Sequence, residues 1–317
     1  MEWYIYLIIG LVAGGVFMYF LLTFIISCII YTKLFVRTSP EKWGRHVSWP
    51  DKELADMFHQ GEMWGQIHED KRKRVEIDSC GFHLVGEYFD FGYDRAVIII
   101  PGRSESGTYS YYFSEPYRLS GFNVLAIDNR GHGLSEGKYN SLGLKEYKDI
   151  LNWGIFLHDE LHIKQIYMHG ICIGSATAIH LLTRKDCPDY FIGLTAEGTY
   201  TTFYDIFNNQ MRARKKPIFP HTYEVLGIVS LRAGKSLRRN SPIHEADKIK
   251  APVLFLYSKK DSFAKPEKSL LLYSKIKSEK RLEWFEEGEH SHIRIHNVEK
   301  YDQTIIKFLK DYFPNER

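Results

Sequence analysis

The sequence has few cysteines and little net charge. Its four cysteines are Cys28, Cys80, Cys172 and Cys187, and no two of them form a Cys-x-x-Cys pair. A disulfide framework or a zinc ribbon is therefore not expected, and free thiols suit a cytosolic setting. The net charge of +3 is too small for a dedicated nucleic-acid binder. We expect no metal ion, no cofactor and no nucleic-acid partner.

The beginning of the chain lacks charge altogether. No charged residue occurs between Glu2 and Lys33, and residues 3–31 are almost wholly apolar. A helix needs about 20 apolar residues to cross roughly 30 Å of hydrocarbon, so this run can span a bilayer with some tilt. The alternative is a cleaved signal peptide, but the run is longer than such a segment and no positive region precedes it. We therefore predict a transmembrane anchor over residues 1–32 that contacts the membrane through residues 3–31.

The charges that flank this run predict its orientation. Only Glu2 and the terminal amine precede it, whereas Lys33, Arg37, Lys42 and Arg45 follow it. Positively charged flanks stay on the cytoplasmic side of a membrane. We expect a single-pass protein of the cell membrane with its main domain in the cytoplasm.

After a connector at residues 33–70, whose tryptophans we expect on the domain surface or at the bilayer interface, strands and helices alternate over residues 71–317. Strands are predicted at residues 75–78, 82–89, 96–100, 123–127, 165–169, 191–196, 252–258 and 281–285, and helices at residues 144–161, 173–185 and 298–312. Repeated strand–helix units predict an α/β fold, in which a mainly parallel sheet of about eight strands has helices on both faces.

Residues 200–240 interrupt this alternation. The segment is rich in aromatic residues and holds eight basic side chains against two acidic ones, Asp205 and Glu224. We interpret it as a small helical cap inserted in the main domain. Basic side chains usually only solvate a surface, but each contributes about 1 kcal/mol near an anionic leaflet, so the cap is also a candidate for membrane contact.

A short turn between a predicted strand and a predicted helix holds the candidate nucleophile. Residues 170–174 read Gly-Ile-Cys-Ile-Gly, so that Gly170 and Gly174 flank Cys172 at two positions on either side. A nucleophile on so tight a turn has strained backbone angles, and side chains at the two flanking positions would collide with neighbouring backbone. This is the pattern of the nucleophile elbow, with cysteine in place of serine.

The remaining parts of a catalytic triad follow in the order acid, then histidine. Asp261 comes after the strand at residues 252–258, and His290 comes after the strand at residues 281–285. The carboxyl ends of parallel strands form one edge of a sheet, where such sites lie. His290 would take the thiol proton and Asp261 would orient its ring. The backbone N–H groups of Ile173 and Arg103 would form the oxyanion hole.

Several residues compete for these roles. His292 lies two positions after His290, and Glu197 follows a different strand from Asp261. Cys172 is also open to the interpretation of an inert buried thiol, because cysteine is among the most buried residue types. Further candidate nucleophiles, and a histidine that we expect to pack in a loop, complete the set: Ser104, Ser106, Ser175 and His132.

Residues 128–135 read Asp-Asn-Arg-Gly-His-Gly-Leu-Ser, which closely resembles the D-x-R-G-H-G-x-S segment of the α/β-hydrolase superfamily. Residues 241–243 and 249–254 resemble the lead into the seventh strand of that superfamily. The resemblance covers residues 75–313 and is closest to bacterial serine-aminopeptidase-like and esterase-like hydrolases with a short cap. It implies a hydrolase that cleaves an ester, thioester or amide bond of a small or lipid-like acyl substrate.

Two features depart from the superfamily pattern. The chain has Pro101-Gly102 where His-Gly is usual, and it has Cys172 where serine is usual. Dienelactone hydrolases show that the fold can use a cysteine, and a nearby imidazole and helix N-terminus favour the thiolate. The alternatives are an inactive, membrane-tethered interaction module and an acyltransferase, because a thioester can pass its acyl group to an acceptor other than water. The sequence does not indicate an oligomeric state.

Overall fold

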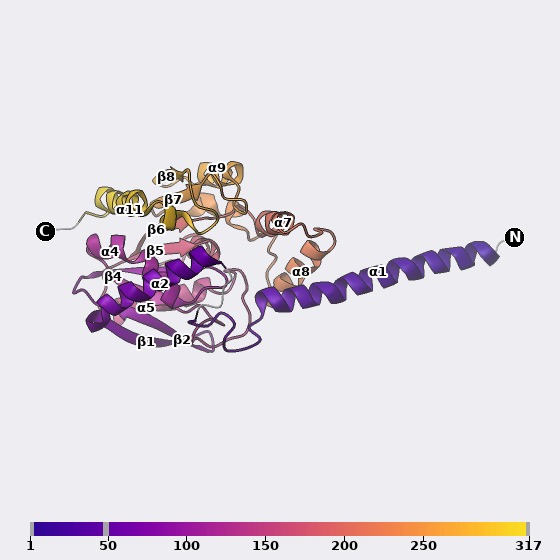
Figure 1. Ribbon diagram of the computed structural model, residues 1–317, viewed down its shortest axis with the longest axis horizontal. Coiled ribbons are helices and arrows are strands. Elements are labelled where there is room, and N and C mark those ends of the chain that lie inside the picture. The colour runs from indigo at the N-terminus through magenta and orange to yellow at the C-terminus, as the bar shows by residue number, and fades with distance from the viewer. Residues whose placement is uncertain (1–2, 47–50, 315–317) are drawn as a thin grey trace.

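A single eight-stranded sheet forms the centre of the computed structural model, which describes residues 3–46 and 51–314 (Figure 1). The strand order is β1-β2-β4-β3-β5-β6-β7-β8; β2 is antiparallel to β1 and to β4, and the other neighbours are parallel. This confirms the predicted α/β fold. The strands are β1 (Arg72–Ser79), β2 (Phe82–Phe89), β3 (Arg95–Ile100), β4 (Asn123–Ile127), β5 (Gln165–Ile171), β6 (Phe191–Glu197), β7 (Val253–Ser258) and β8 (Lys280–Phe285).

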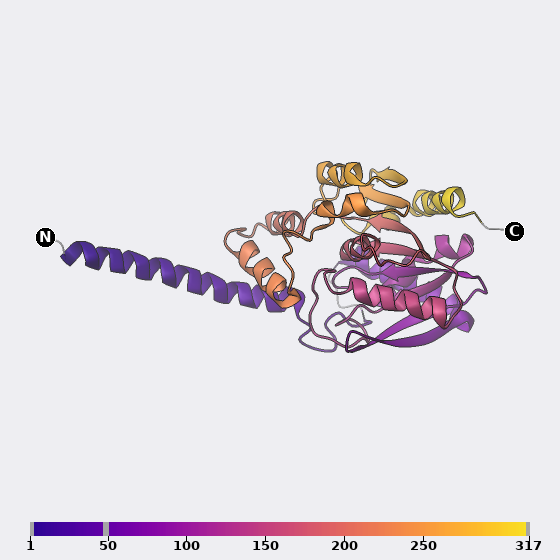
Figure 2. The same ribbon diagram turned by 180° about the vertical axis from the view of Figure 1, so that it is seen from behind.

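Helices cover both faces of the sheet (Figures 1 and 2). In β3, Ile98 and Ile100 face one core and Val97 and Ile99 face the other, which is why this strand is apolar throughout. The helices are α1 (Trp3–Phe35), α2 (Lys52–Ile67), α3 (Gly107–Ser110), α4 (Glu115–Leu119), α5 (Tyr147–Asp159), α6 (Ile173–Leu182), α7 (Phe203–Ala213), α8 (His221–Ala233), α9 (Pro266–Lys275), α10 (Ile293–His296) and α11 (Val298–Tyr312), with single 3-10 turns η1 (Glu69–Lys71), η2 (Tyr111–Phe113), η3 (Pro242–His244) and η4 (Ala246–Lys248). Helices α5, α6 and α9 contribute to the first core, and α2, α4 and α11 to the second.

The connector is packed into the main domain. Met57 and Phe58 of α2 are buried in the second core, and the ring of Trp64 lies 4.8 Å from that of Phe89. The ring of Trp43 stacks on the ring of His132, with 4.6 Å between the ring centroids. Trp49 lies outside the described residues. The domain limits at residues 32 and 70 stay a prediction, and residues on both sides of the second limit share one core.

Helix α1 (Trp3–Phe35) is the one helix among the described residues that is long and apolar enough to cross a membrane. Figures 1 and 2 show it projecting from the domain as a single rod. Residues 3–22 are exposed throughout, and from Thr23 onward every fourth residue is buried. Such spacing places one stripe of side chains on one side of the helix. The buried residues of the stripe are Thr23, Ser27, Tyr31 and Phe35.

This stripe packs on the two cap helices, α7 and α8. Tyr31 and Phe35 share a third core with residues of both helices. Glu224 of α8 accepts hydrogen bonds from the hydroxyls of Thr23 (3.1 Å) and Ser27 (2.7 Å), and Ser27 Oγ also lies 2.8 Å from Nδ1 of His221. The last third of α1 is therefore fixed to the cap by polar as well as apolar contacts.

Replacing Ser27 with leucine should weaken the contact between α1 and the cap. The change leaves Glu224 and His221 facing an apolar side chain, and unpartnered buried polar groups cost about 1–3 kcal/mol. For a chain of this size we expect the thermal midpoint of the protein in detergent to fall by roughly 2–8 °C. Thr32→Leu is the matched control, because Thr32 is exposed and its hydroxyl bonds the Cys28 carbonyl of its own helix. Equal midpoints for the two variants would contradict the role of this contact.

Candidate active site

The turn from β5 into α6 holds Cys172 in a strained conformation. Its backbone angles are φ 51° and ψ −104°, a region that costs free energy for any residue with a side chain. A Cβ atom on Gly174 would lie 2.0 Å from the Ile100 carbonyl oxygen, and one on Gly170 would lie 2.4 Å from the Ser175 nitrogen. The turn therefore has the geometry of a nucleophile elbow, for the steric reason expected from the sequence. Ser175, a rival nucleophile, instead donates its hydroxyl to the carbonyl oxygen of Gly170.

His290 lies between Asp261 and the cysteine. Asp261 Oδ2 is 2.7 Å from His290 Nδ1, and Asp261 Oδ1 accepts the N–H groups of Phe263 (2.8 Å) and Ala264 (2.7 Å). The other ring nitrogen, Nε2, is buried on the side of the Cys172 sulfur, which is a hydrogen-bond partner of the ring. The three side chains thus follow one another in the order that proton transfer requires.

The charges of the site set the protonation of His290. Burial lowers the pKa of His290, but the negative charge and hydrogen bond of Asp261 and the negative charge of Cys172 outweigh burial and raise this pKa well above its usual value. An imidazolium beside the sulfur stabilises a thiolate and is ready to donate its proton to a leaving group.

The competing residues have other partners. His292 Nδ1 lies 3.1 Å from a carboxylate oxygen of Glu53 on α2. Glu197 is fully buried behind the elbow, where it accepts the hydroxyl of Tyr301. Of these candidate acids and histidines, the fold brings His290 and Asp261 together with Cys172.

The predicted oxyanion donors lie at two segment ends that meet near Cys172. Ile173 is the first residue of α6, whose N–H has no acceptor within the helix. Arg103 follows β3 in the Pro101–Arg103 loop. That loop is held from behind, because Asn129 Nδ2 donates to the Pro101 oxygen (3.2 Å) and His132 Nε2 lies 2.5 Å from the Arg103 oxygen. The segment at residues 128–135 thus supports the Pro101–Arg103 loop, and His132 packs in a loop as expected.

Two charged side chains near the cysteine were missed in the sequence. The Arg103 guanidinium donates to the Leu34 oxygen at the end of α1 (2.9 Å), lies 5.5 Å from the Phe35 ring centroid and interacts electrostatically with Cys172. Glu105 accepts the N–H of Gly102 (2.7 Å), and burial raises the pKa of its carboxyl to about 7. In the sequence, the one indication of these two side chains was that charged residues follow soon after β3.

A small apolar cavity of about 30 Å³ adjoins Cys172. It has room for roughly one or two water molecules. Its walls come from α1, from the cap and from the elbow. The cavity is lined by Phe35, Arg103, Leu142, Cys172, Ile173, Tyr200, Phe203, Ile206, Phe207, Gln210 and Leu226.

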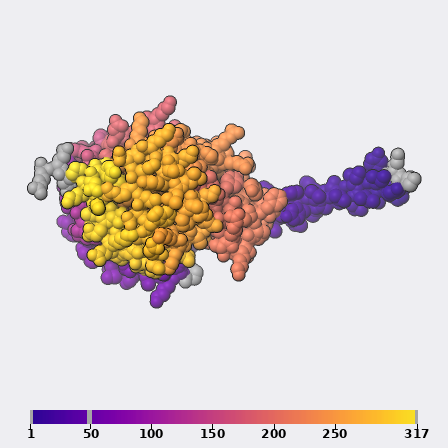
Figure 3. Space-filling view, turned by 90° about the horizontal axis from the view of Figure 1, so that it is seen from above, coloured from indigo at the N-terminus to yellow at the C-terminus, as the bar shows by residue number. Residues whose placement is uncertain are grey.

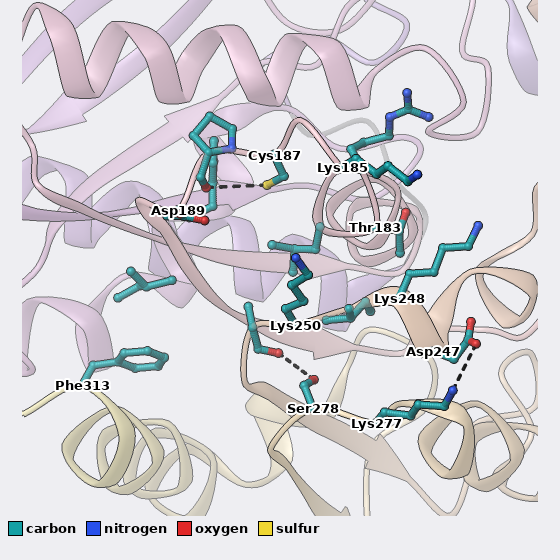
Figure 4. A pocket seen from close by; sticks show the side chains of 17 residues that line it. Thr183, Lys185, Cys187, Asp189, Asp247, Lys248, Lys250, Lys277, Ser278 and Phe313 are labelled. Carbon is teal, nitrogen blue, oxygen red and sulfur yellow. Dashed lines mark hydrogen bonds and ion pairs between the residues drawn. The ribbon is translucent and has the colours of Figure 1, made fainter.

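A much larger cleft, of about 1180 Å³, lies at the opposite edge of the sheet (Figure 4). Lys185, Lys248, Lys250 and Lys277 line it, in segments that lead into β6, β7 and β8. These segments are at the amino ends of the strands. The cleft is therefore separated by the length of the sheet from Cys172, which follows the carboxyl end of β5.

The sequence and the structure were compared with known proteins. The profile of a family described as "alpha/beta hydrolase fold" matches residues 95–225. An uncharacterized protein of Bacillus subtilis (strain 168), YqkD, is 34% identical over 218 residues, which cover 68% of this chain and 71% of the relative. An esterase of Pyrococcus furiosus superposes with a TM-score of 0.64 at 24% identity, covering 78% of this chain and 94% of the esterase.

A second similar structure belongs to a peptidase rather than to an esterase. An acylaminoacyl peptidase of Pyrococcus horikoshii has a TM-score of 0.58 at 19% identity, covering 80% of this chain and 44% of the peptidase. At these identities, the likeness to both solved structures shows the fold.

Adding a methyl group at Gly174 should destabilise the protein. The new Cβ cannot be placed beside the Ile100 carbonyl oxygen, so Gly174→Ala should lower the free energy of unfolding by about 3 kcal/mol or more. Gly227→Ala in α8 is the matched control, since no atom lies within 4 Å of its Cβ. There the exchange should stabilise the helix by about 0.5–1 kcal/mol. Denaturant unfolding in detergent measures both, and a Gly174→Ala protein of normal stability would contradict the contact.

Glu105 should make the stability depend on pH. Its carboxyl keeps its proton in the folded state up to a pKa of about 7, whereas the unfolded chain releases it near 4.5. The folded state binds more protons in this window, so the contribution of Glu105 to stability is lost as the pH rises through it. Relative to the wild type, Glu105→Gln should gain about 2–3 kcal/mol between pH 4.5 and pH 8. Exposed Glu299→Gln serves as control; parallel pH curves for Glu105→Gln and the wild type would exclude this effect.

Proposed function

The chain belongs to the α/β-hydrolase superfamily, and we propose that it hydrolyses an ester, thioester or amide of a small or lipid-like acyl group through an intermediate on Cys172. One observation carries the proposal. The imidazole of His290 is held by Asp261 at 2.7 Å on one side, and its second nitrogen is buried on the side of the Cys172 sulfur, which is a hydrogen-bond partner of the ring. A thiol within hydrogen-bond reach of a base that a third group orients is the arrangement that nucleophilic catalysis needs.

The reaction follows from these positions. The Cys172 sulfur attacks the acyl carbon, and the N–H groups of Ile173 and Arg103 bind the oxygen that becomes negative. Nε2 of His290 donates its proton to the leaving alcohol, thiol or amine, which leaves a thioester on Cys172. The same nitrogen then takes a proton from a water molecule that attacks the thioester, so that the acid departs and the thiolate–imidazolium pair is restored.

We also propose that α1 is retained as a single membrane anchor, with the main domain in the cytoplasm. The basic residues that follow α1 support this orientation. Loss of the segment as a signal peptide would uncover the cap face that Tyr31 and Phe35 bury. The proposed organisation is an anchor at residues 1–32, a connector at 33–70, and a hydrolase domain at 71–317 with its cap at about 200–240.

Replacing His290 and His292 separately with alanine should distinguish the proposed catalytic histidine from its neighbour. His290→Ala should lower kcat/KM for p-nitrophenyl acetate by about 10²–10⁴-fold, because general acid–base catalysis contributes that much. His292→Ala is the matched control, because His292 bonds Glu53, and its kcat/KM should change less than about threefold. Cys172→Ala should reduce hydrolysis to the uncatalysed rate. Full activity in Cys172→Ala would overturn the assignment of the nucleophile.

The reactivity of the thiol tests the inactive alternative directly. Iodoacetamide at pH 6 should alkylate Cys172 faster than Cys80, which is exposed and serves as an ordinary thiol within the same chain. His290→Ala should remove the difference. Slower reaction at Cys172 than at Cys80 would favour an interaction module. A reactive Cys172 that forms a thioester without releasing acid in water would favour an acyltransferase.

A further inference from the structure

The exposed part of α1 matches the thickness of a membrane. Residues 3–22 are exposed along their whole length. A helix of about 20 residues is roughly 30 Å long, the thickness of the hydrocarbon core. Thr23 is the first buried residue, and it bonds Glu224 of the cap. A carboxylate is costly inside hydrocarbon, so the bilayer core should end before this contact.

The connection between α7 and α8 extends from the cap toward the membrane. In Figures 1 and 2, residues 214–220 form the part of the domain that reaches furthest along α1. Arg214, Lys215 and Lys216 of this connection are exposed, Phe219 is 62% exposed, and Tyr223 in the first turn of α8 is 48% exposed. Basic side chains next to exposed aromatic rings are typical of the headgroup layer of an anionic leaflet.

The contacts between α8 and α1 indicate how far each part of α8 lies from the membrane. His221 and Glu224, at the start of α8, contact Ser27 and Thr23, whereas Arg232, near its end, lies over Tyr31. Helix α8 therefore runs away from the membrane. Leu231 is 83% exposed but lies eight residues beyond Tyr223, roughly 12 Å further along the helix. The exposed rings near the membrane are thus distinct from the exposed leucine of the same helix. Figure 3 shows the cap surface beside the base of α1.

The same elements close the cavity beside the cysteine. Phe35 of α1, Phe207 of α7 and Leu226 of α8 are among its walls, and its volume of about 30 Å³ admits no more than a very short acyl group. A longer chain reaches the sulfur only if these walls separate. All three belong to elements that extend from the site along α1, so a gap between them would lead toward the exposed part of that helix.

We propose that the segment from Arg214 to Tyr223 sits in the headgroup layer of an anionic leaflet, and that Cys172 takes its acyl group from an amphiphile held in that leaflet. The second half of this proposal rests on the proposed acyl chemistry of Cys172, and the first half does not. The basic side chains hold the anionic surface, the two aromatic rings enter the headgroup layer, and the acyl chain passes between α1 and the cap.

The test compares a soluble ester with a membrane-borne one. The full-length protein is placed in vesicles of phosphatidylcholine with phosphatidylglycerol, and kcat/KM is measured for p-nitrophenyl acetate and p-nitrophenyl palmitate. The double variant Phe219→Ser/Tyr223→Ser should lose about tenfold or more for the palmitate, because two aromatic groups no longer enter the interface. Its kcat/KM for the acetate should stay within about twofold. Leu231→Ser, the matched control, should leave both values unchanged.

The outcomes separate the two halves of the proposal. Equal losses for both esters in the double variant, or an equal loss in Leu231→Ser, would overturn the membrane-borne substrate. If neither ester is hydrolysed and Cys172 is unreactive, the proposed function fails, and the membrane contact is judged by hydrogen exchange alone. Residues 214–223 should then exchange more slowly in anionic vesicles than in detergent, and Lys215→Ala/Lys216→Ala should remove that difference. Identical exchange in vesicles and detergent would overturn the membrane contact as well.

Discussion

The close contact between the Cys172 turn and the end of β3 determines the geometry of the whole site. Gly174 approaches the Ile100 carbonyl so closely that no Cβ fits between them. The chain leaves Ile100 directly into the Pro101–Arg103 loop, so this one contact positions both the proposed nucleophile and a proposed oxyanion donor. A displacement of the elbow would therefore change the distance between the Cys172 sulfur and the Arg103 N–H. The strained φ of Cys172 is the cost of this placement, and the surrounding sheet holds it.

The charges around the sulfur suggest why a cysteine suits this position. Two cationic groups, the His290 ring and the Arg103 guanidinium, act on the sulfur in a place that is largely closed to water. Positive charge beside a sulfur favours a thiolate, and a thiol releases its proton far more readily than a serine hydroxyl does. The raised pKa of Glu105 fits the same picture, since its burial keeps another negative charge from forming below about pH 7.

Local sequence patterns were sufficient to predict the sheet and the elbow. The helix at residues 298–312 has the predicted bounds, because its apolar spacing is strong and its ends are free of competing signals. The order of Cys172, Asp261 and His290 could be predicted because each residue follows a strand, and parallel strands end at one edge. The side chains of Arg103 and Glu105 could not be placed, since their surroundings come from α1, β3 and the elbow together.

The contact between α1 and the cap was hidden for a different reason. Thr23 and Ser27 read as tolerated polar residues in an apolar run, and their partner Glu224 is about 200 residues away in the sequence. The four-residue spacing from Thr23 to Phe35 was visible, but a stripe predicts a packed face only when a partner is known. Apolar periodicity disappears in a helix that is apolar on every side, so only the polar members could have indicated the docked face.

The docking of α1 on the cap links this helix to the candidate site. Phe35 closes the cavity beside Cys172, and the Leu34 carbonyl accepts a hydrogen bond from the Arg103 side chain. Helix α1 therefore also contributes a wall to the candidate site and holds the Arg103 guanidinium in place. The change from exposed to docked residues in α1 falls between Leu22 and Thr23 rather than at the end of the apolar run. A chain cut after residue 31 would keep Phe35 but would lose Thr23, Ser27 and Tyr31, which hold α1 on the cap, whereas a chain cut before Thr23 would keep all four residues.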